Sequence, residues 1–282
     1  MHLAPEYVTQ THRLALGLEP LDAMRGGRAT HPVRLEVEGP LPRPLTRRRD
    51  PYQHAVTAGM TRPVVSRHDS CLHVLLYHTA LTGRERIDVR IYDSCRRYVP
   101  RRLSIPLLTP AQAEIEPYLY RVRRPALFPG AAYDASKRWT GLRGRVIRNG
   151  RPMRWARIEA RLSADGRHVS RAQGDDRGEF LLLLDRLPEP MEDHLSDPLL
   201  IVVAVYGPEQ APAPSSADLP DRDALWDLPL EIVPAPGGMD LVSTGERLPE
   251  TYGPQPLVER EVPFRLGRTI SRVNGVRDFV AS

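Results

Sequence analysis

The densest group of residues able to do chemistry comprises His68, Cys71, His73, His78 and Cys95. Imidazole and thiolate are ligands that Zn²⁺ prefers. The spacing contains no Cys-x-x-Cys or His-x-x-x-His pair, and in a strand residues 68 and 78 point to the face opposite residues 71 and 73. Only Cys71, His73 and Cys95 could converge, which leaves a fourth ligand missing. We therefore expect no metal site and no other cofactor.

A β-hairpin offers another interpretation of the same residues. Residues 72–79 and 86–93 have strand character, and the segment 81–84 between them has turn chemistry. A turn centred on Gly83 would form three cross-strand pairs: Cys71 with Cys95, His73 with Asp93, and His78 with Asp88. Such pairs each contribute about 0.2–1 kcal/mol. The cysteines could form a disulfide, but we expect thiols in a reducing cytosol.

Other reactive residues do not form a catalytic or nucleotide-binding pattern. His68, Asp69 and Ser70 are adjacent, so their side chains diverge and cannot relay a proton. The chain lacks a Gly-x-Ser-x-Gly elbow, a Gly-x-x-x-x-Gly-Lys-Ser/Thr loop and a Gly-x-Gly-x-x-Gly loop. Asp175 and Asp176 could suggest calcium, but the EF-hand spacing is missing and acids beside glycine usually cap turns. We predict that the protein is not an enzyme.

Arginine clusters lie at residues 43–49, 96–102 and 121–124, each near a tyrosine. Arginine interleaved with aromatic residues can hold single-stranded nucleic acid. More often, such residues form solvated strand edges or bind acidic protein surfaces. The net charge of +5 combines a basic first half with an acidic second half, which suits contacts between subunits. We therefore expect protein partners rather than nucleic acid.

The elements that position these residues are predicted to be strands. The 282 residues include 29 Pro and 20 Gly, and 41% are hydrophobic, which favours short strands, turns and extended connections. The first twenty residues lack the basic start and apolar run of a secretory signal. The longest apolar runs, 180–184 and 199–206, are too short to span a membrane. We expect a cytoplasmic protein with no membrane span.

The chain divides into five predicted segments. Residues 1–31 form an arm that glycine and proline keep irregular, and residues 32–108 form a small β domain. Residues 109–138 are a Pro-rich linker that begins with a short helix capped by Thr109. Residues 139–233 form a β-sandwich with strands near 140–148, 154–163, 167–173, 178–185, 199–206 and 228–233. Residues 234–282, with six prolines, form an extended C-terminal arm with one candidate strand near 262–266.

The sandwich segment carries a series of short motifs: Gly144-x-Val146, Gly150-x-Pro152, Ala156-x-Ile158 and Asp176-x-Gly178-x-Phe180. Asn149-Gly150 favours a type I′ hairpin turn; Ala156 and Ile158 should face inward and Trp155 outward. This series resembles the carboxypeptidase-regulatory-like family, which folds as a seven-stranded, transthyretin-like sandwich. In that family the domain is usually a spacer, a docking surface or a chaperoning appendage, so the resemblance implies no functional residues. The predicted fold class is all-β: a small N-terminal β domain and an Ig/transthyretin-like sandwich with extended Pro-rich arms.

The whole layout is similar to accessory structural proteins at the cap or baseplate of phage-tail-like contractile injection systems. The sequence thus predicts a structural assembly protein that binds neighbouring subunits in a homo-oligomeric ring or a larger complex. The alternative is a binding module or regulatory subunit that recognises carbohydrate or peptide through the sandwich loops. Aromatic and arginine side chains dominate interface energies, so the interface candidates are Arg47, Arg48, Arg49, Trp155, Trp226, Tyr252 and Phe264. Truncation after Val233 should spare the melting temperature and prevent assembly.

Overall fold

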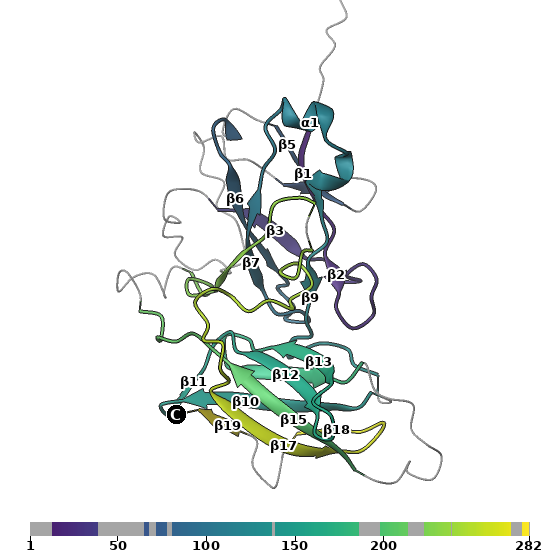
Figure 1. Ribbon diagram of the computed structural model, residues 1–282, viewed down its shortest axis with the longest axis vertical. Helices are drawn as coiled ribbons and strands as arrows, with labels where there is room; N and C mark the ends of the chain where they lie inside the picture. Colours follow the sequence, from purple (N-terminus) through teal and green to yellow (C-terminus); the bar gives the residue numbers. More distant parts are fainter. Residues whose placement is uncertain are drawn as a thin grey trace, which may run out of the picture.

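The computed structural model describes residues 13–38, 65–67, 72–77, 81–136, 139–185, 198–213, 223–237, 239–271 and 278–281. The described chain is nearly all β, which confirms the all-β class that the sequence predicts. Its strands form two lobes stacked along the long axis of the molecule, with the N-terminal lobe in the upper half of Figure 1 and a β-sandwich below it.

Short strands in three sheets build the N-terminal lobe. The first sheet has the order β4-β5-β1-β8 and contains β1 (Leu14–Leu18), β4 (Ser66–Arg67), β5 (His73–Leu76) and β8 (Val122–Arg123). The second has the order β16-β7-β6-β3 and contains β3 (Arg34–Val37), β6 (Arg86–Tyr92), β7 (Arg101–Pro106) and β16 (Leu230–Ile232). The third is a parallel pair of β2 (Leu21–Asp22) and β9 (Ala126–Leu127).

The predicted helix after residue 109 is present as α1 (Gln112–Ile115), and a 3₁₀ helix, η2 (Tyr118–Arg121), follows it. The Thr109 hydroxyl accepts a hydrogen bond from the Gln112 backbone N–H (3.2 Å), and the Gln112 side-chain oxygen accepts one from the Thr109 N–H (2.9 Å). These reciprocal bonds fix the start of the helix. Pro117 then separates the two helical turns.

Residues 14–18, which the sequence placed in an irregular arm, form β1 between β5 and β8. Ala15, Leu16 and Leu18 are buried in the core of the lobe. Because the strand is covered on both faces, its residues do not alternate between apolar and polar, and the two-residue period that reveals a half-exposed strand is missing.

The hairpin predicted between β5 and β6 is wrong. β5 pairs with β1 and β4, whereas β6 pairs with β3 and β7. His73 therefore lies opposite Leu18, and Asp93 accepts hydrogen bonds from the backbone N–H groups of Cys95 and Arg97. The ladder between β6 and β7 buries apolar side chains from both strands, which favours that pairing. Cys71 and His78 lie outside the described residues.

The sandwich packs two sheets face to face. One has the order β11-β10-β14 and contains β10 (Gly141–Arg148), β11 (Arg151–Pro152) and β14 (Glu179–Leu183), with β18 (Thr269–Ile270) and β19 (Asp278–Ala281) also paired to β10. The other has the order β13-β12-β15-β17 and contains β12 (Arg157–Leu162), β13 (His168–Gln173), β15 (Leu199–Tyr206) and β17 (Val258–Phe264).

Local predictions for the sandwich are confirmed. Asn149 and Gly150 have φ angles of 50° and 72° between the paired residues Arg148 and Arg151, as in a type I′ turn. Ala156 and Ile158 lie in the sandwich core. Trp155 lies outside that core, in a separate cluster with residues of the N-terminal lobe.

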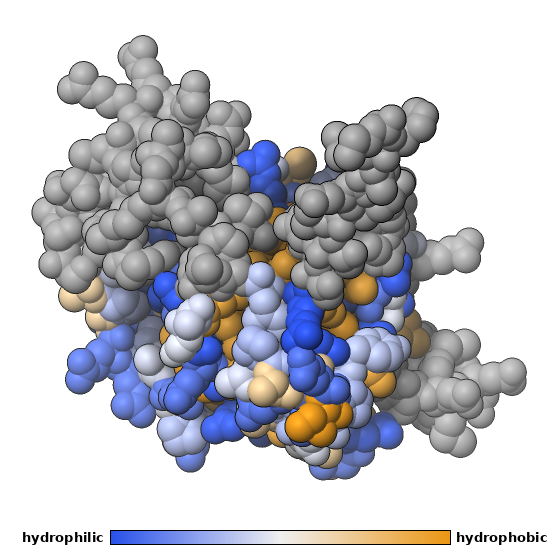
Figure 2. Space-filling model, turned by 90° about the horizontal axis from the view of Figure 1, so that it is seen from above, coloured by the Kyte–Doolittle hydropathy of each residue, from blue (hydrophilic) through white to orange (hydrophobic). Residues whose placement is uncertain are grey.

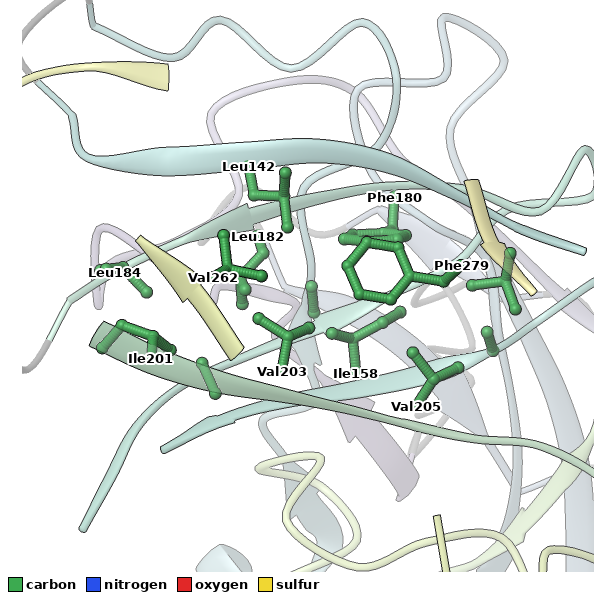
Figure 3. Close-up of a cluster of buried hydrophobic side chains, with 14 of the residues drawn as sticks. Leu142, Ile158, Phe180, Leu182, Leu184, Ile201, Val203, Val205, Val262 and Phe279 are labelled. Carbon is green, nitrogen blue, oxygen red and sulfur yellow. The ribbon is translucent and has the colours of Figure 1, made fainter. Parts of the chain in front are cut away.

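The predicted C-terminal arm belongs to the sandwich from β17 onward, whereas Val242 before it packs in the core of the N-terminal lobe. β17 pairs with β15 over seven residues, and β18 and β19 run parallel to β10. Val262, Phe264 and Phe279 are buried in the sandwich core, and Figure 3 shows Val262 and Phe279 among the side chains of the other strands. Truncation after Val233 would remove these side chains, so the expectation that it spares the melting temperature is wrong.

The predicted boundary at residue 233 also differs from the structure. β16 leaves the sandwich and pairs in parallel with β7 of the N-terminal lobe. The strand β14 is buried on both faces: Phe180 and Leu182 point into the sandwich core, and Leu181 and Leu183 belong to the core of the N-terminal lobe. The two lobes therefore share an apolar contact and a chain that crosses between them repeatedly.

Candidate functional site

A buried ion cluster lies at the junction of the lobes. Arg101 of β7 donates two hydrogen bonds to the Glu231 carboxylate, at 3.0 and 2.7 Å. Arg157 of β12 in the sandwich lies 3.0 Å from the same carboxylate. All three side chains are buried. Arg101 also donates to the carbonyl oxygens of Ala126 and Ser243, so one guanidinium ties together four segments of the chain.

The protonation of Glu231 follows from this arrangement. Burial alone would raise the pKa of its carboxyl, because a low-dielectric environment disfavours the charged form. The positive charges of Arg101 and Arg157 and the hydrogen bonds from Arg101 outweigh burial and hold the pKa below its usual value. A carboxylate kept ionised between two arginines does not act as a general acid, so we assign the cluster a structural role.

Trp155 forms a second link between the lobes. Its backbone has a positive φ of 62°, and its indole N–H donates to Asp227 at 2.8 Å. Arg154 also pairs with Asp227, at 2.7 Å. The Tyr252 hydroxyl donates to the Trp155 carbonyl oxygen at 2.6 Å. These contacts hold residues 223–252 against the sandwich.

The predicted interface residues therefore require correction. Trp155, Tyr252 and Phe264 are buried within the chain, and their contacts are internal ones. Trp226 is half-buried, while Arg47, Arg48 and Arg49 lie outside the described residues. The prediction failed for these three residues because large aromatic side chains are found in cores as well as in interfaces. Residue type alone does not distinguish the two locations.

The basic clusters are also engaged inside the chain. Arg96 pairs with Asp176 across the junction, at 2.9 and 3.2 Å. Arg102 pairs with Glu38 at 2.7 Å, and Arg124 pairs with Glu19 at 2.8 Å. These pairs engage three of the seven arginines at residues 96–102 and 121–124.

The remaining metal candidates are placed as follows. His73 is half-buried in β5, and burial, helped by the charge of Arg67, lowers the pKa of its imidazole. Cys95 is exposed and carries a free thiol. Asp175 caps its own turn by accepting hydrogen bonds from the N–H groups of Arg177 and Glu179, at 2.8 and 2.9 Å. Across the described ranges, no three His, Cys, Asp or Glu side chains are grouped so that they could hold a metal ion.

A cavity of about 220 Å³ lies where β2, β9 and β13 meet. Two polar side chains on its wall, Asp22 and Ser170, are engaged by the protein. Asp22 accepts hydrogen bonds from the hydroxyls of Tyr98 and Tyr133, and the Ser170 hydroxyl donates to the Leu183 carbonyl oxygen. We assign no ligand to this cavity.

The surface feature that sequence reasoning missed lies at the end of the N-terminal lobe. Four apolar side chains from α1 and η2 are exposed there: Ile115 (86%), Tyr118 (65%), Leu119 (54%) and Tyr120 (38%). We call them the apolar tip. Figure 1 places α1 at the end of this lobe farthest from the sandwich. Figure 2, viewed from above, shows apolar side chains open to the surface among polar ones.

The backbone of the tip is held by local bonds. The Glu116 N–H donates to the Gln112 carbonyl oxygen at 2.9 Å, and the Tyr120 N–H donates to the Pro117 carbonyl oxygen at 3.0 Å. Glu114 forms an ion pair with Arg13 beside β1. The tip therefore presents apolar groups on an ordered turn. The sequence signal was four large apolar residues in six positions beside Pro117, with no helical period to bury them.

No protein-family model matches the chain, and no curated protein or solved structure matches it. Among the helices that the structure describes, none has the length and apolar character needed to cross a membrane.

Proposed function

We propose that the protein is a non-enzymatic assembly subunit that docks on a neighbouring protein through its apolar tip. The observation that carries the proposal is the exposure of Ile115, Tyr118, Leu119 and Tyr120 on two successive helical turns, α1 and η2. Contiguous exposed apolar groups with a polar surround mark interaction sites in soluble proteins. Aromatic side chains are also the commonest energetic anchors of interfaces.

The charges around the tip indicate what kind of surface it fits. The stretch from Thr109 to Tyr120 contains Glu114 and Glu116. Arg121, the last residue of η2, is half-buried and donates to the Leu14 carbonyl oxygen at 3.4 Å. Arg13 neutralises Glu114, and Glu116 is exposed. A partner with an apolar groove and basic side chains on its rim would complement the tip in both respects.

The junction between the lobes supports a spacer role. The cluster of Arg101, Glu231 and Arg157 and the shared apolar contact of β14 fix the lobes to each other. A docking surface at one end of such a body can hold the other end at a set position. The sequence layout leads us to propose the cap or baseplate of a phage-tail-like contractile injection system as the assembly.

A triple variant, Ile115→Ser with Tyr118→Ser and Leu119→Ser, tests the proposal. The protein is co-expressed with the proteins encoded beside its gene, and the assembled complex is quantified by native mass spectrometry. The matched control is Met239→Ser, which removes an exposed apolar side chain that belongs to neither α1 nor η2. We expect the triple variant to fold normally and to lose at least tenfold in incorporation, while the control assembles fully. Incorporation of the triple variant at the wild-type level would overturn the proposal.

A further inference from the structure

Glu116 lies in the chain between exposed side chains of the apolar tip. Ile115 directly precedes it, and Tyr118 follows two residues later. The Glu116 backbone is extended, with φ −79° and ψ 143°, and its N–H donates to the Gln112 carbonyl oxygen at 2.9 Å. The ring of Pro117, the next residue, restricts the backbone further. A partner that covers both Ile115 and Tyr118 therefore also covers the position of Glu116.

The charge of Glu116 is not offset by a neighbour. The residue is exposed, and among the residues that the structure describes none forms an ion pair with it. Glu114, two residues earlier, pairs with Arg13. Arg121, the next basic residue along the chain, donates to the Leu14 carbonyl oxygen at 3.4 Å. The carboxylate of Glu116 thus stands among apolar side chains without a counter-charge from the described chain.

Docking through the tip removes water from this carboxylate. The loss of hydration of an ionised carboxylate that gains no counter-charge opposes binding strongly. A purely apolar surface would therefore disfavour the tip, although it suits Ile115, Tyr118 and Leu119. A guanidinium or ammonium group that donates hydrogen bonds to the carboxylate replaces the lost water. The same charge that excludes apolar surfaces therefore selects a surface with a cation at this position.

We propose that Glu116 determines which partner the tip accepts, by forming a direct ion pair with one arginine or lysine of that partner. The inference rests on the proposed docking through the tip, and it adds the place of the recognised cation, between the surfaces that receive Ile115 and Tyr118. A groove whose basic residues all lie away from this place does not bind. Glu114 has no such role because Arg13 already pairs with it.

Two substitutions with the same effect on net charge separate this ion pair from the general field of the tip. Glu116→Gln and Glu114→Gln each remove one carboxylate, so they change the long-range attraction to a basic partner nearly equally. Only Glu116→Gln removes the proposed pair. Each light variant chain competes with heavy-isotope wild type for the proteins encoded beside the gene, prepared without this chain. Native mass spectrometry then gives the ratio of light to heavy chain in the complex.

We expect incorporation of Glu116→Gln to fall at least roughly tenfold below wild type, and that of Glu114→Gln to stay within roughly threefold of it. The tip triple variant is measured in the same competition. If the triple variant is excluded while the two glutamine variants behave alike, the inference is overturned and docking through the tip stands. If the triple variant competes as wild type does, docking through the tip is wrong and this inference falls with it.

Charge reversal identifies the cation. The chain carries Glu116→Arg, and in the neighbouring proteins each lysine and arginine is changed in turn to glutamate. Like charges should exclude Glu116→Arg from the complex, and one reversed residue of one neighbour should restore its incorporation. The control is Glu250→Arg, which reverses an exposed glutamate outside α1 and η2 and should assemble as wild type does. Incorporation of Glu116→Arg at the wild-type level, or exclusion that no reversed residue relieves, would overturn the inference.

Discussion

Glu231 connects the two lobes through charge, and its replacement tests how firmly they are joined. Its carboxylate faces the guanidiniums of Arg101 and Arg157, and all three side chains are buried. Glu231→Gln keeps the size of the side chain and removes its negative charge, which leaves two buried cations without a counter-charge. Removing one partner of a buried ion pair typically costs about 3–5 kcal/mol.

For a chain of this length, a loss of that size lowers the melting temperature by roughly 2 °C per kcal/mol, or roughly 6–10 °C in total. Thermal unfolding followed by circular dichroism measures the change. The matched control is Asp165→Asn, because Asp165 pairs with Arg167 at 3.8 Å on the exposed surface and such pairs contribute about 0–1 kcal/mol. If Glu231→Gln destabilises the protein no more than the control does, the cluster does not hold the lobes together.

The same pair of proteins gives a pH dependence with a defined sign. The pKa of Glu231 in the folded protein is below its ordinary value of 4.5, because the arginine charges outweigh the effect of burial. Its stabilising contribution is therefore complete above pH 4.5 and is lost as the pH falls toward the folded pKa. The difference in stability between wild type and Glu231→Gln should stay constant near neutral pH and shrink below pH 4.5. A difference that grows on acidification would contradict this reasoning.

Four further predictions concern the sandwich and metals. Phe279→Ala should cost about 3–5 kcal/mol in urea unfolding because the ring is buried, and truncation after Val233 should abolish cooperative unfolding of the sandwich. Gly150→Ala should lower the free energy of unfolding by about 1–2 kcal/mol, because Gly150 has a φ of 72°. The control is Gly27→Ala, which should not destabilise the protein because Gly27 has no positive φ and open space around it. Equal effects of the two substitutions would refute the turn assignment. EDTA should leave the melting temperature unchanged, and a fall that zinc restores would reveal a metal site.

The sequence predicted those strands whose signals are local. The alternation in β12 and the dipeptide Asn149-Gly150 are properties of short segments, and the structure bears them out. Strand partners depend on distant residues. β5 and β6 are neighbours in sequence, but β5 pairs with β1 and β4 whereas β6 pairs with β3 and β7, so the hairpin and its pair of His73 with Asp93 were wrong.

Of the C-terminal strands, the sequence predicted only a segment near residues 262–266, which overlaps β17, because proline and short length hide the others. β17 contains Pro263, which sequence reasoning treats as a strand breaker, but an edge strand tolerates it. β19 has only four residues, too few for a periodic pattern. The interface residues were predicted wrongly for a related reason. Trp155 and Tyr252 are residue types that favour interfaces, but tertiary contacts bury both side chains within the chain. Ile115 and Leu119 are types that favour cores, and they are exposed.

Photo-crosslinking from the apolar tip tests the central claim most directly. A benzophenone amino acid replaces Tyr118 in the full chain, and the assembly is formed by co-expression and irradiated. The same group at Met239 serves as the control. The account predicts that position 118 crosslinks to a different polypeptide at an apolar segment flanked by basic residues, and that position 239 does not. Crosslinks from position 118 that stay within the same chain, in an assembly that has formed normally, would contradict it.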